Sequence, residues 1–322
     1  MNLQDDQTSA DLFQVATFYS FTAWPEVTIA CLLQDLLSLG DEHQLMGTVL
    51  LAEEGVNGTI CGSVGGVSAL LERLERDLIE GLFELKISWT PEQAFRRFKV
   101  RRKAEIVTMG LAGLNPSKTV GTYVDAHEWN DLIDDPDTLL IDTRNDYEIA
   151  IGEFKGAINP QTKCFRDFPA WVEQQLRSMV KAQTPARIAM YCTGGIRCEK
   201  ATSYLLEKGF TNVHHLRGGI LRYFEEVSQA ESRWQGECFV FDQRVALNHQ
   251  LSPGVHRLCH ACGMPLTPED QTMNSYLPGV QCRHCVDQFS DTDRIRFAER
   301  QRQMEHSSRT VSYTHLTLPT KA

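Results

Sequence analysis

The sequence predicts a multidomain protein of mixed α+β and α/β class, and three observations support this prediction. Residues 1–115 alternate strand and helix signals in the order βαββαβ, and residues 116–235 alternate buried strands with helices. Residues 236–302 contain two closely spaced pairs of cysteines and few apolar runs. A length of 322 residues suits two domains and a smaller module.

The βαββαβ order of the first segment indicates a ferredoxin-like, or acylphosphatase-like, domain. Its expected strands are 14–21, 47–52, 59–61, 82–89 and 98–107, and its expected helices are about 25–39 and 67–80. Pro25 fits the start of the first helix, and Gly40 is expected to end it. The Gly55–Gly58 stretch predicts a turn into the third strand.

Basic residues are concentrated near the end of this segment. Six of them lie within eight positions and are called the basic stripe here: Arg96, Arg97, Lys99, Arg101, Arg102 and Lys103. On an otherwise acidic segment, such a cluster predicts either an anion-binding surface for a phosphate backbone or an edge strand that charge protects from aggregation.

The second segment predicts a parallel α/β sheet with helices on both faces. Its expected strands are 138–142, 187–192 and 212–216, and its expected helices are 125–133, 168–180, 198–208 and 219–228. Asn115-Pro116-Ser117 is expected to link it to the first domain.

A candidate catalytic loop follows the strand at 187–192. Cys192 stands at the strand end, where open α/β sheets place ligands, and is followed by Thr193, Gly194, Gly195 and Ile196. The glycines allow backbone N–H groups to turn inward, and the next helix and Arg197 add positive charge. These features favour a thiolate, so we expect Cys192 and Arg197 to be catalytic.

The spacing within this loop separates two chemistries. A phosphate-cradling cysteine phosphatase loop has five residues between Cys and Arg, whereas four separate Cys192 from Arg197. The smaller loop suits a single sulfur atom better than a phosphate. Cys198, one turn into the helix, is expected to be a small buried side chain, or else to resolve a persulfide by forming a disulfide.

The third segment carries a predicted metal site. Cys259 and Cys262 form one C-x2-C pair, and Cys282 and Cys285 form a second pair after nineteen residues. This spacing is typical of a four-thiolate structural zinc site, which would fold a segment too small to be held by apolar burial alone. His260 and His284 lie inside the pairs and are expected outside the ligand set.

Composition excludes several classes of protein. A net charge of −10, with 42% hydrophobic and 23% charged residues, is typical of a globular chain rather than a disordered or fibrous one. No apolar run approaches the ~18 residues of a membrane span, and the N-terminus lacks the order of a signal peptide. We therefore expect a cytoplasmic protein whose ten cysteines are not disulfide-bonded. Residues 303–322 are polar and aperiodic and are expected to be disordered or non-native.

Residues 120–230 resemble a rhodanese domain. The run TLLIDTRNDYEIAIGEFKGAINP at 138–160 is similar to the entry motif of that family, and GFTNVHHLRGGI is similar to its closing motif. The resemblance implies that Cys192 carries a persulfide and that Asp142 and Arg144 form a buried structural pair.

The order of motifs over roughly residues 14–290 resembles the rhodanese-domain tRNA uridine hydroxylases. The matching runs are AEEGVNGTICG at 52–62, FRRFKVRRKAEIVTMG at 95–110, the rhodanese core and the cysteine-rich module. The resemblance implies oxygen-dependent 5-hydroxylation of uridine 34, with tRNA as partner and molecular oxygen as co-substrate. It also favours RNA contact for the basic stripe. No flavin or NAD motif is evident in the sequence.

Two other functions stay open at the level of sequence. A sulfurtransferase would pass a persulfide from Cys192 to an RNA or small-molecule acceptor. A non-catalytic binding protein would use the rhodanese domain to dock a partner, although the intact CTGGIR loop argues against this. The sequence indicates no oligomeric state.

Overall fold

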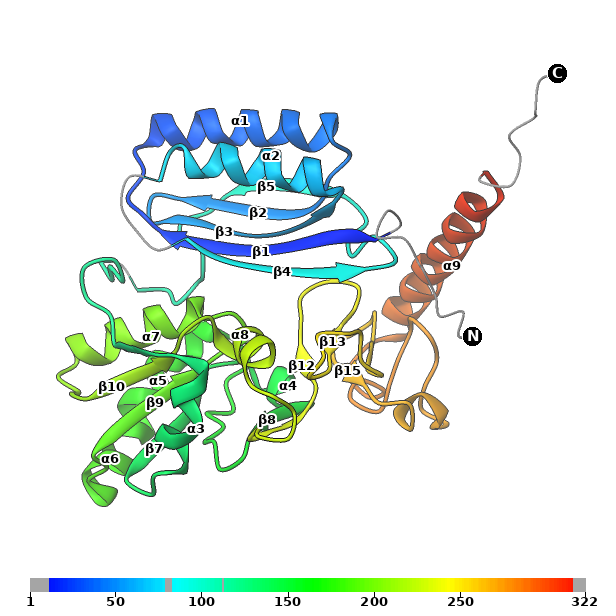
Figure 1. The fold of residues 1–322 in the computed structure, drawn as a ribbon. Helices are drawn as coiled ribbons and strands as arrows, with labels where there is room; N and C mark the ends of the chain where they lie inside the picture. Colours follow the sequence, from blue (N-terminus) through cyan, green and yellow to red (C-terminus); the bar gives the residue numbers. More distant parts are fainter. Residues whose placement is uncertain (1–11, 79–82, 112, 315–322) are drawn as a thin grey trace, which may run out of the picture. The chain divides into compact units, whose positions relative to one another are not determined.

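The structure, a computed structural model, describes residues 12–78, 83–111 and 113–314, the last ten of these by their backbone alone. The chain divides into two compact units, one ending at Pro253 and the other beginning at Gly254 (Figure 1). Each unit is described below by itself.

The first unit begins with the predicted ferredoxin-like domain. Its elements are β1 (Phe13–Phe21), α1 (Glu26–Glu42), β2 (Met46–Ala52), β3 (Gly55–Gly62), α2 (Val64–Glu75), β4 (Glu84–Thr90) and β5 (Phe98–Arg102). The strands form one sheet in the order β4-β1-β3-β2-β5, with α1 and α2 on the same face (Figure 1). β5 runs parallel to β2 at the sheet edge. The apolar faces of the helices and the sheet form the core of this domain.

Three glycines serve different purposes from those expected. Gly40 lies inside α1, where a Cβ would clash with the Phe98 ring, so it permits close packing of β5 and the helix continues to Glu42. Gly55 and Gly58 lie in β3, and the turn falls at 53–54. The expected turn at Gly55–Gly58 is therefore wrong, because β3 begins at once and pairs with β1 and β2 along its length.

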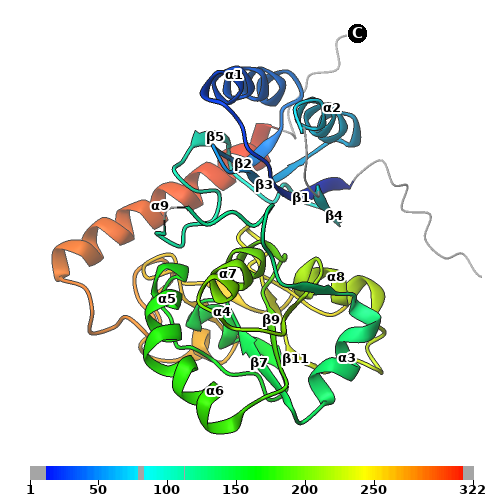
Figure 2. The same ribbon diagram turned by 90° about the vertical axis from the view of Figure 1, so that its left-hand side faces the viewer.

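The second domain of this unit is the predicted parallel α/β domain. Its main elements are β6 (Thr122–Val124), α3 (Ala126–Asp134), β7 (Thr138–Asp142), α4 (Asp146–Ile149), β8 (Gly152–Phe154), α5 (Phe168–Trp171), α6 (Arg177–Gln183), β9 (Arg187–Tyr191), α7 (Ile196–Glu207), β10 (Val213–Leu216) and α8 (Gly219–Glu226). The sheet order is β6-β10-β9-β7, with all strands parallel. Helices cover both faces, α3 and α8 on one and α5 to α7 on the other (Figure 2).

Short strands complete the first unit. β11 (Trp234–Gly236) pairs with β8, and β12 (Cys238–Phe239) pairs with β13 (Ala246–Leu247). Arg244 then reaches β4 of the first domain, where its guanidinium donates to the Ser88 hydroxyl at 2.8 Å. Residues up to Pro253 therefore belong to the same compact unit as the ferredoxin-like domain and the parallel α/β domain, and not to the cysteine-rich segment.

The second unit contains β14 (Arg257–Leu258), β15 (Pro265–Leu266) and α9 (Asp291–Thr314) around a small core that includes three buried cysteines. Of the stretch 303–322, which is expected to be disordered or non-native, residues as far as Thr314 belong to α9, and residues 315–322 lie outside the described residues. Among the described residues, no helix is long and apolar enough to cross a membrane.

Candidate active site

Cys192 lies at the carboxyl end of the central strand β9, and the turn that follows leads directly into α7. The backbone N–H of Gly195 donates to Cys192 Sγ at 3.1 Å. Gly195 has a φ of +103°, and a Cβ there would lie 2.7 Å from the Tyr19 hydroxyl, so both backbone conformation and space require glycine. The structure thus brings together the loop residues that the sequence singled out, 192–197.

The Cys192 sulfur is held as a thiolate. Burial acts most strongly and opposes ionisation, but hydrogen bonds from the Cys198 thiol and from backbone N–H groups, with the charge of Arg197, outweigh it. Together they lower the pKa of Cys192 to about 5. Burial and the neighbouring Cys192 raise the pKa of Cys198 well above its usual range, so Cys198 stays a protonated donor. At neutral pH the loop holds one thiolate and one thiol.

Arg197 is engaged with a carboxylate rather than free in the loop. Its two terminal nitrogens donate to the Glu148 carboxylate at 2.6 and 2.8 Å, and both side chains are buried. Glu148 also accepts from the Asn145 backbone, as part of the cap of α4. The positive charge of Arg197 therefore favours the thiolate from close by, while its hydrogen bonds fix the loop to α4.

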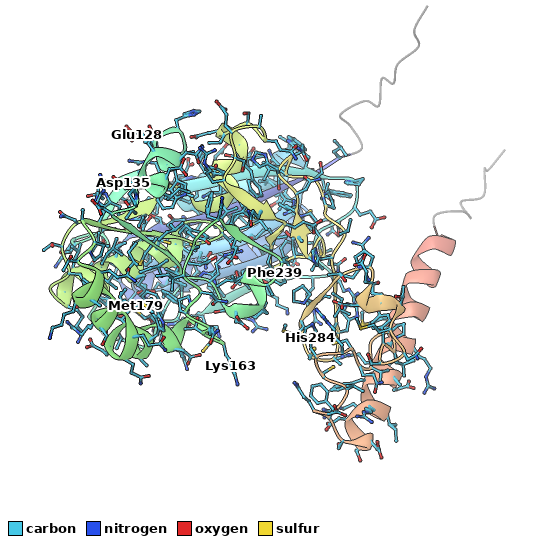
Figure 3. All side chains as sticks on the ribbon, turned by 90° about the horizontal axis from the view of Figure 1, so that it is seen from below. Glu128, Asp135, Lys163, Met179, Phe239 and His284 are labelled. Atoms are coloured by element: carbon cyan, nitrogen blue, oxygen red, sulfur yellow. The ribbon has the colours of Figure 1, made fainter. Side chains whose placement is uncertain are left out.

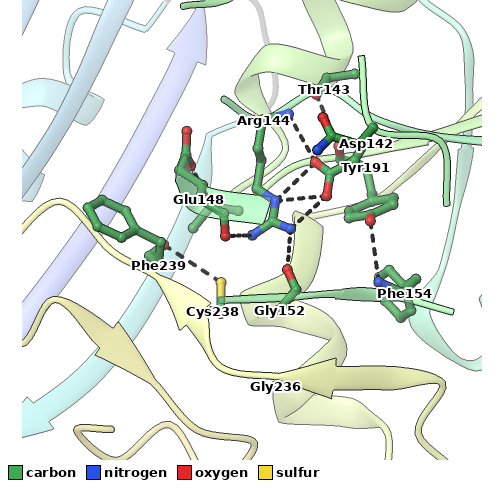
Figure 4. A network of polar contacts seen from close by, with 12 residues as sticks. Asp142, Thr143, Arg144, Glu148, Gly152, Phe154, Tyr191, Gly236, Cys238 and Phe239 are labelled. Atoms are coloured by element: carbon green, nitrogen blue, oxygen red, sulfur yellow. Dashed lines mark hydrogen bonds and ion pairs between the residues drawn. The ribbon is translucent and has the colours of Figure 1, made fainter. Parts of the chain in front are cut away.

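Asp142 and Arg144 form a fully buried ion pair below the loop, with 2.6 Å between the closest atoms (Figure 4). The remaining donors of Arg144 reach the backbone carbonyl groups of Glu148 and Gly152. Its guanidinium also lies over the Trp234 ring, 5.0 Å from the centroid. Its hydrogen bonds outside the pair are to the backbone of α4 and β8 rather than to the loop sulfur, so the pair holds these two elements to the end of β7.

The ferredoxin-like domain contributes directly to the loop. Lys86, on β4, is almost fully buried, and its ammonium donates to the Gly194 carbonyl at 3.0 Å. Tyr19, on β1, donates to the Glu199 carboxylate at 2.7 Å on the first turn of α7. Burial is the main reason that the pKa of Glu199 is raised to about 7. The thiolate loop is therefore flanked by the buried ammonium of Lys86 and by the carboxyl of Glu199, which is partly protonated at neutral pH.

An ion triad around the buried ammonium of Lys200 joins the two domains beside this site. Lys200, on α7, donates to Glu54 at 2.9 Å, to Glu105 at 2.6 Å and to the Val107 carbonyl at 2.9 Å. All three ammonium hydrogens are thereby used. Glu54 opens the distinctive EGVNGT run of the sequence, so this run holds the first domain against α7.

A cavity of about 490 Å³ lies between the Cys192 loop and the face of the first sheet that lacks helices. This volume falls within the range of about 300–1,000 Å³ typical of small-molecule sites. Its walls combine sulfur, hydroxyl, amide and aromatic groups: Cys192, Thr193, Thr17, Thr48, Thr59, Asn57, Tyr19, Phe95, Phe165 and Phe241 among others. The thiolate thus faces an enclosure that both domains build.

The basic stripe lies along and around the edge strand β5. Phe98 and Val100 pack against the core under the helices, so alternation along the strand places Lys99 and Arg101 on the opposite face. Arg102 points to the helix side and pairs with Glu26 of α1. Arg96, Arg97 and Lys103 are exposed and flank the strand.

The four cysteines of the second unit converge as predicted. The sulfur atoms of Cys259, Cys262, Cys282 and Cys285 all lie within 4.8 Å of one another, with nearest separations of 3.7 to 4.0 Å. Four thiolates about 2.3 Å from a tetrahedral metal ion would lie about 3.8 Å apart, so this cluster can hold a metal ion. His284 lies in the second pair (Figure 3), and its Nε2 contacts Arg283 rather than the cluster.

Several side chains at the site escaped the sequence analysis. Lys86, Tyr19, Glu199 and the threonines of the cavity wall lie in ordinary strand or helix patterns, and only sheet register brings them to Cys192. The one available signal was charge: Glu199 and Lys200 are ionisable residues within α7, and residues 197–205 of that helix are all buried.

The fold and the loop define the class of protein: an acylphosphatase-like domain joined to a rhodanese domain with an intact cysteine loop. Residues 13–106 match the family model of the UPF0176 acylphosphatase like domain, and residues 125–226 match that of the Rhodanese-like domain. A protein of Prochlorococcus marinus (strain MIT 9313), named tRNA uridine(34) hydroxylase, is 97% identical over 309 residues, which cover 96% of this chain and 100% of that protein. One of Synechococcus sp. (strain CC9902), with the same name, is 58% identical over 299 residues, covering 91% and 98% of the two chains. The chain belongs to the tRNA uridine(34) hydroxylase family.

Proposed function

We propose that this chain is a tRNA-modifying oxidoreductase that hydroxylates carbon 5 of uridine 34, with molecular oxygen as co-substrate. Full-length relatives carry this name at up to 97% identity. The geometric observation that carries the proposal is the Cys192 thiolate on the wall of a cavity large enough for a nucleobase. Modifying enzymes reach a base by turning it out of its stack into such a pocket.

The charge of the loop favours this function over sulfur transfer from a small anion. Glu148 engages both terminal nitrogens of Arg197, so this arginine is not free to bind a doubly charged sulfur donor. An uncharged uracil ring needs no such cation. The alternative, a sulfurtransferase with a persulfide on Cys192, uses the same loop and is separated from hydroxylation by its product.

Cys192 and Arg197 are assigned distinct parts in the reaction. Cys192 supplies the nucleophilic thiolate beside the base, and the loop 193–196 supplies backbone N–H groups that hold it. Arg197 is a positioning residue, which favours the thiolate by its charge and ties the loop to Glu148. In hydroxylation one atom of molecular oxygen enters the C5–H bond of the base and the other leaves as water, and an external reductant supplies the two electrons and two protons that this requires.

The proposal also assigns roles to the basic stripe and to the cysteine cluster of the second unit. The basic stripe contacts tRNA phosphates through its members other than Arg102, which pairs with Glu26, and the four cysteines hold zinc as a structural ion that folds the second unit. Thiolate ligands at these separations suit zinc, which binds with no open coordination position when all four are sulfur. We place the protein in the cytoplasm, where its tRNA substrate and a reducing environment are found.

The test is the nucleoside composition of tRNA from a host lacking the gene, complemented with wild type, with Cys192→Ser or with Cys31→Ser. Cys31 is exposed on α1 and serves as the matched control. Mass spectrometry should detect 5-hydroxyuridine or its descendants with wild type and the control, but not with Cys192→Ser. Full activity of Cys192→Ser would refute the role of this cysteine, and a loss of thiolated nucleosides alone would establish sulfur transfer.

A further inference from the structure

A row of polar side chains crosses the open face of the first sheet. In register, Thr17 pairs with Thr59 of β3 and with Lys86 of β4. Thr59 pairs in turn with Thr48 of β2, and Thr48 pairs with Lys99 of β5. Paired residues on adjacent strands share a face, so three threonines lie in line between two lysines.

The two ends of this row meet different surroundings. Lys86 is buried and contacts the Gly194 carbonyl of the Cys192 loop, whereas Lys99 lies at the sheet edge beside Arg101. The three threonines between them line the cavity that Cys192 faces. One end of the row thus touches the reactive loop, and the other reaches the basic stripe.

The hydrogen-bonding groups on this wall have a definite pattern. The Asn57 amide nitrogen donates one of its two hydrogens to the Ile106 carbonyl at 2.9 Å, so the amide oxygen and the second amide hydrogen are left for a ligand. Thr17 and Thr59 share one hydrogen bond of 3.1 Å, which leaves one hydroxyl hydrogen of the two for a ligand. Thr48 adds a further hydroxyl to the wall.

This pattern complements uracil. The pairing edge of uracil presents an N3–H donor between two carbonyl acceptors. Thr59 and Thr48 lie in the next row along β3 and β2, so the Asn57 oxygen can accept from N3–H while a threonine hydroxyl on one side of it donates to a uracil carbonyl. Cytosine carries a bare acceptor at N3, so in the same orientation it would face the Asn57 oxygen without a hydrogen and bind more weakly than uracil. The rings of Phe95, Phe165 and Phe241 in the same cavity are available to stack on the base.

We propose that the open face of the acylphosphatase-like sheet is the uridine-recognition site. Asn57, Thr48 and Thr59 bind the pairing edge of the base, and Lys99 and Arg101 bind adjoining phosphates. This inference rests on the proposed function and adds the specificity-determining residues to it. It also divides the basic stripe, because Arg102, on the helix face and paired with Glu26, takes no part.

The experiment measures binding of the full-length chain to two tRNA transcripts that differ only by U or C at position 34. Thr59→Val, which keeps the side-chain shape, should lose about tenfold in affinity for the U34 transcript and leave binding of the C34 transcript unchanged. Lys99→Ala combined with Arg101→Ala should weaken both transcripts equally and reduce the slope of log affinity against log salt by about 1.4. Arg102→Ala is the matched control and should alter neither.

The outcomes are distinguishable from failure of the proposed function. If wild type forms 5-hydroxyuridine but Thr59→Val, and likewise Thr48→Val, keep wild-type preference for U34 and wild-type kcat/KM, the base is recognised elsewhere and this inference is wrong. An Arg102→Ala effect as large as that of the Lys99 and Arg101 variant would also overturn it. A wild-type chain that prefers U34 but forms no hydroxylated product would support the recognition site and refute the hydroxylase. Thermal unfolding of each variant shows whether a loss reflects the site or the fold.

Discussion

Removal of the Cys198 thiol should raise the pKa of the Cys192 thiolate. Apart from burial, which opposes ionisation, the hydrogen bond from Cys198 is the strongest influence on Cys192 and helps bring its pKa to about 5. A hydrogen bond to a charged group contributes about 1.5–3 kcal/mol, and a tenfold change in acidity corresponds to about 1.4 kcal/mol. Cys198→Ala should therefore raise the pKa of Cys192 by roughly 1–2 pH units.

The assay is the pH dependence of alkylation of Cys192 by iodoacetamide, followed by mass spectrometry of the peptide that contains it. Cys198→Ser is the matched variant, because its hydroxyl also donates a hydrogen bond and should keep the pKa of Cys192 low. Mapping by peptide separates Cys192 from the nine other cysteines.

Wild type should be alkylated at a nearly constant rate from pH 6.5 to 8.5, since its thiolate is already formed. The Ala variant should instead gain reactivity as the pH rises across that range. An unchanged profile in Cys198→Ala would show that Cys198 is not the donor, and that Arg197 and the loop N–H groups alone keep the sulfur ionised.

Three further results are expected. Arg144→Met should lower the free energy of unfolding in urea by about 3–5 kcal/mol, because it leaves the buried Asp142 carboxylate unpaired; a loss below 1 kcal/mol would contradict the buried pair. Burial raises the pKa of Glu199 to about 7, so stability from its protonated form is complete below about pH 4.5 and is lost as the pH rises through 7. Between pH 5 and pH 8, the free energy of unfolding of wild type should fall by up to about 3 kcal/mol more than that of Glu199→Gln, as measured by urea titration. Equal falls in wild type and variant would refute this reasoning. Cys282→Ser should reduce the zinc content measured by atomic emission and unfold residues 254–302, as should a chelator, while the first unit keeps its melting transition.

Sequence alone indicated the fold and the loop because both depend on local patterns. The βαββαβ order and the alternation of 116–235 follow from apolar periodicity, and the Cys192 loop and the cysteine pairs are contiguous runs. Glycines were interpreted less well: Gly40, Gly55 and Gly58 look like helix or strand breakers in sequence, but each allows a neighbouring strand or ring to approach closely.

The groups around Cys192 could not be predicted in the same way. Lys86 and Tyr19 reach the loop from strands more than a hundred residues away, and their positions depend on which strand lies beside which. The sequence also placed all six cations of the basic stripe in one class. Strand alternation divides them between two faces only once Phe98 and Val100 are known to point toward the helices.

The ion triad of Lys200, Glu54 and Glu105 has a consequence for how this protein can evolve. Loss of both carboxylates would leave the buried Lys200 ammonium without an ionic partner, so the residues tolerated at positions 54 and 105 depend on the residue at position 200. The two domains are therefore not interchangeable parts. A chimera whose rhodanese half lacks a lysine at position 200 should be less stable than either parent unless positions 54 and 105 come from the parent of that half.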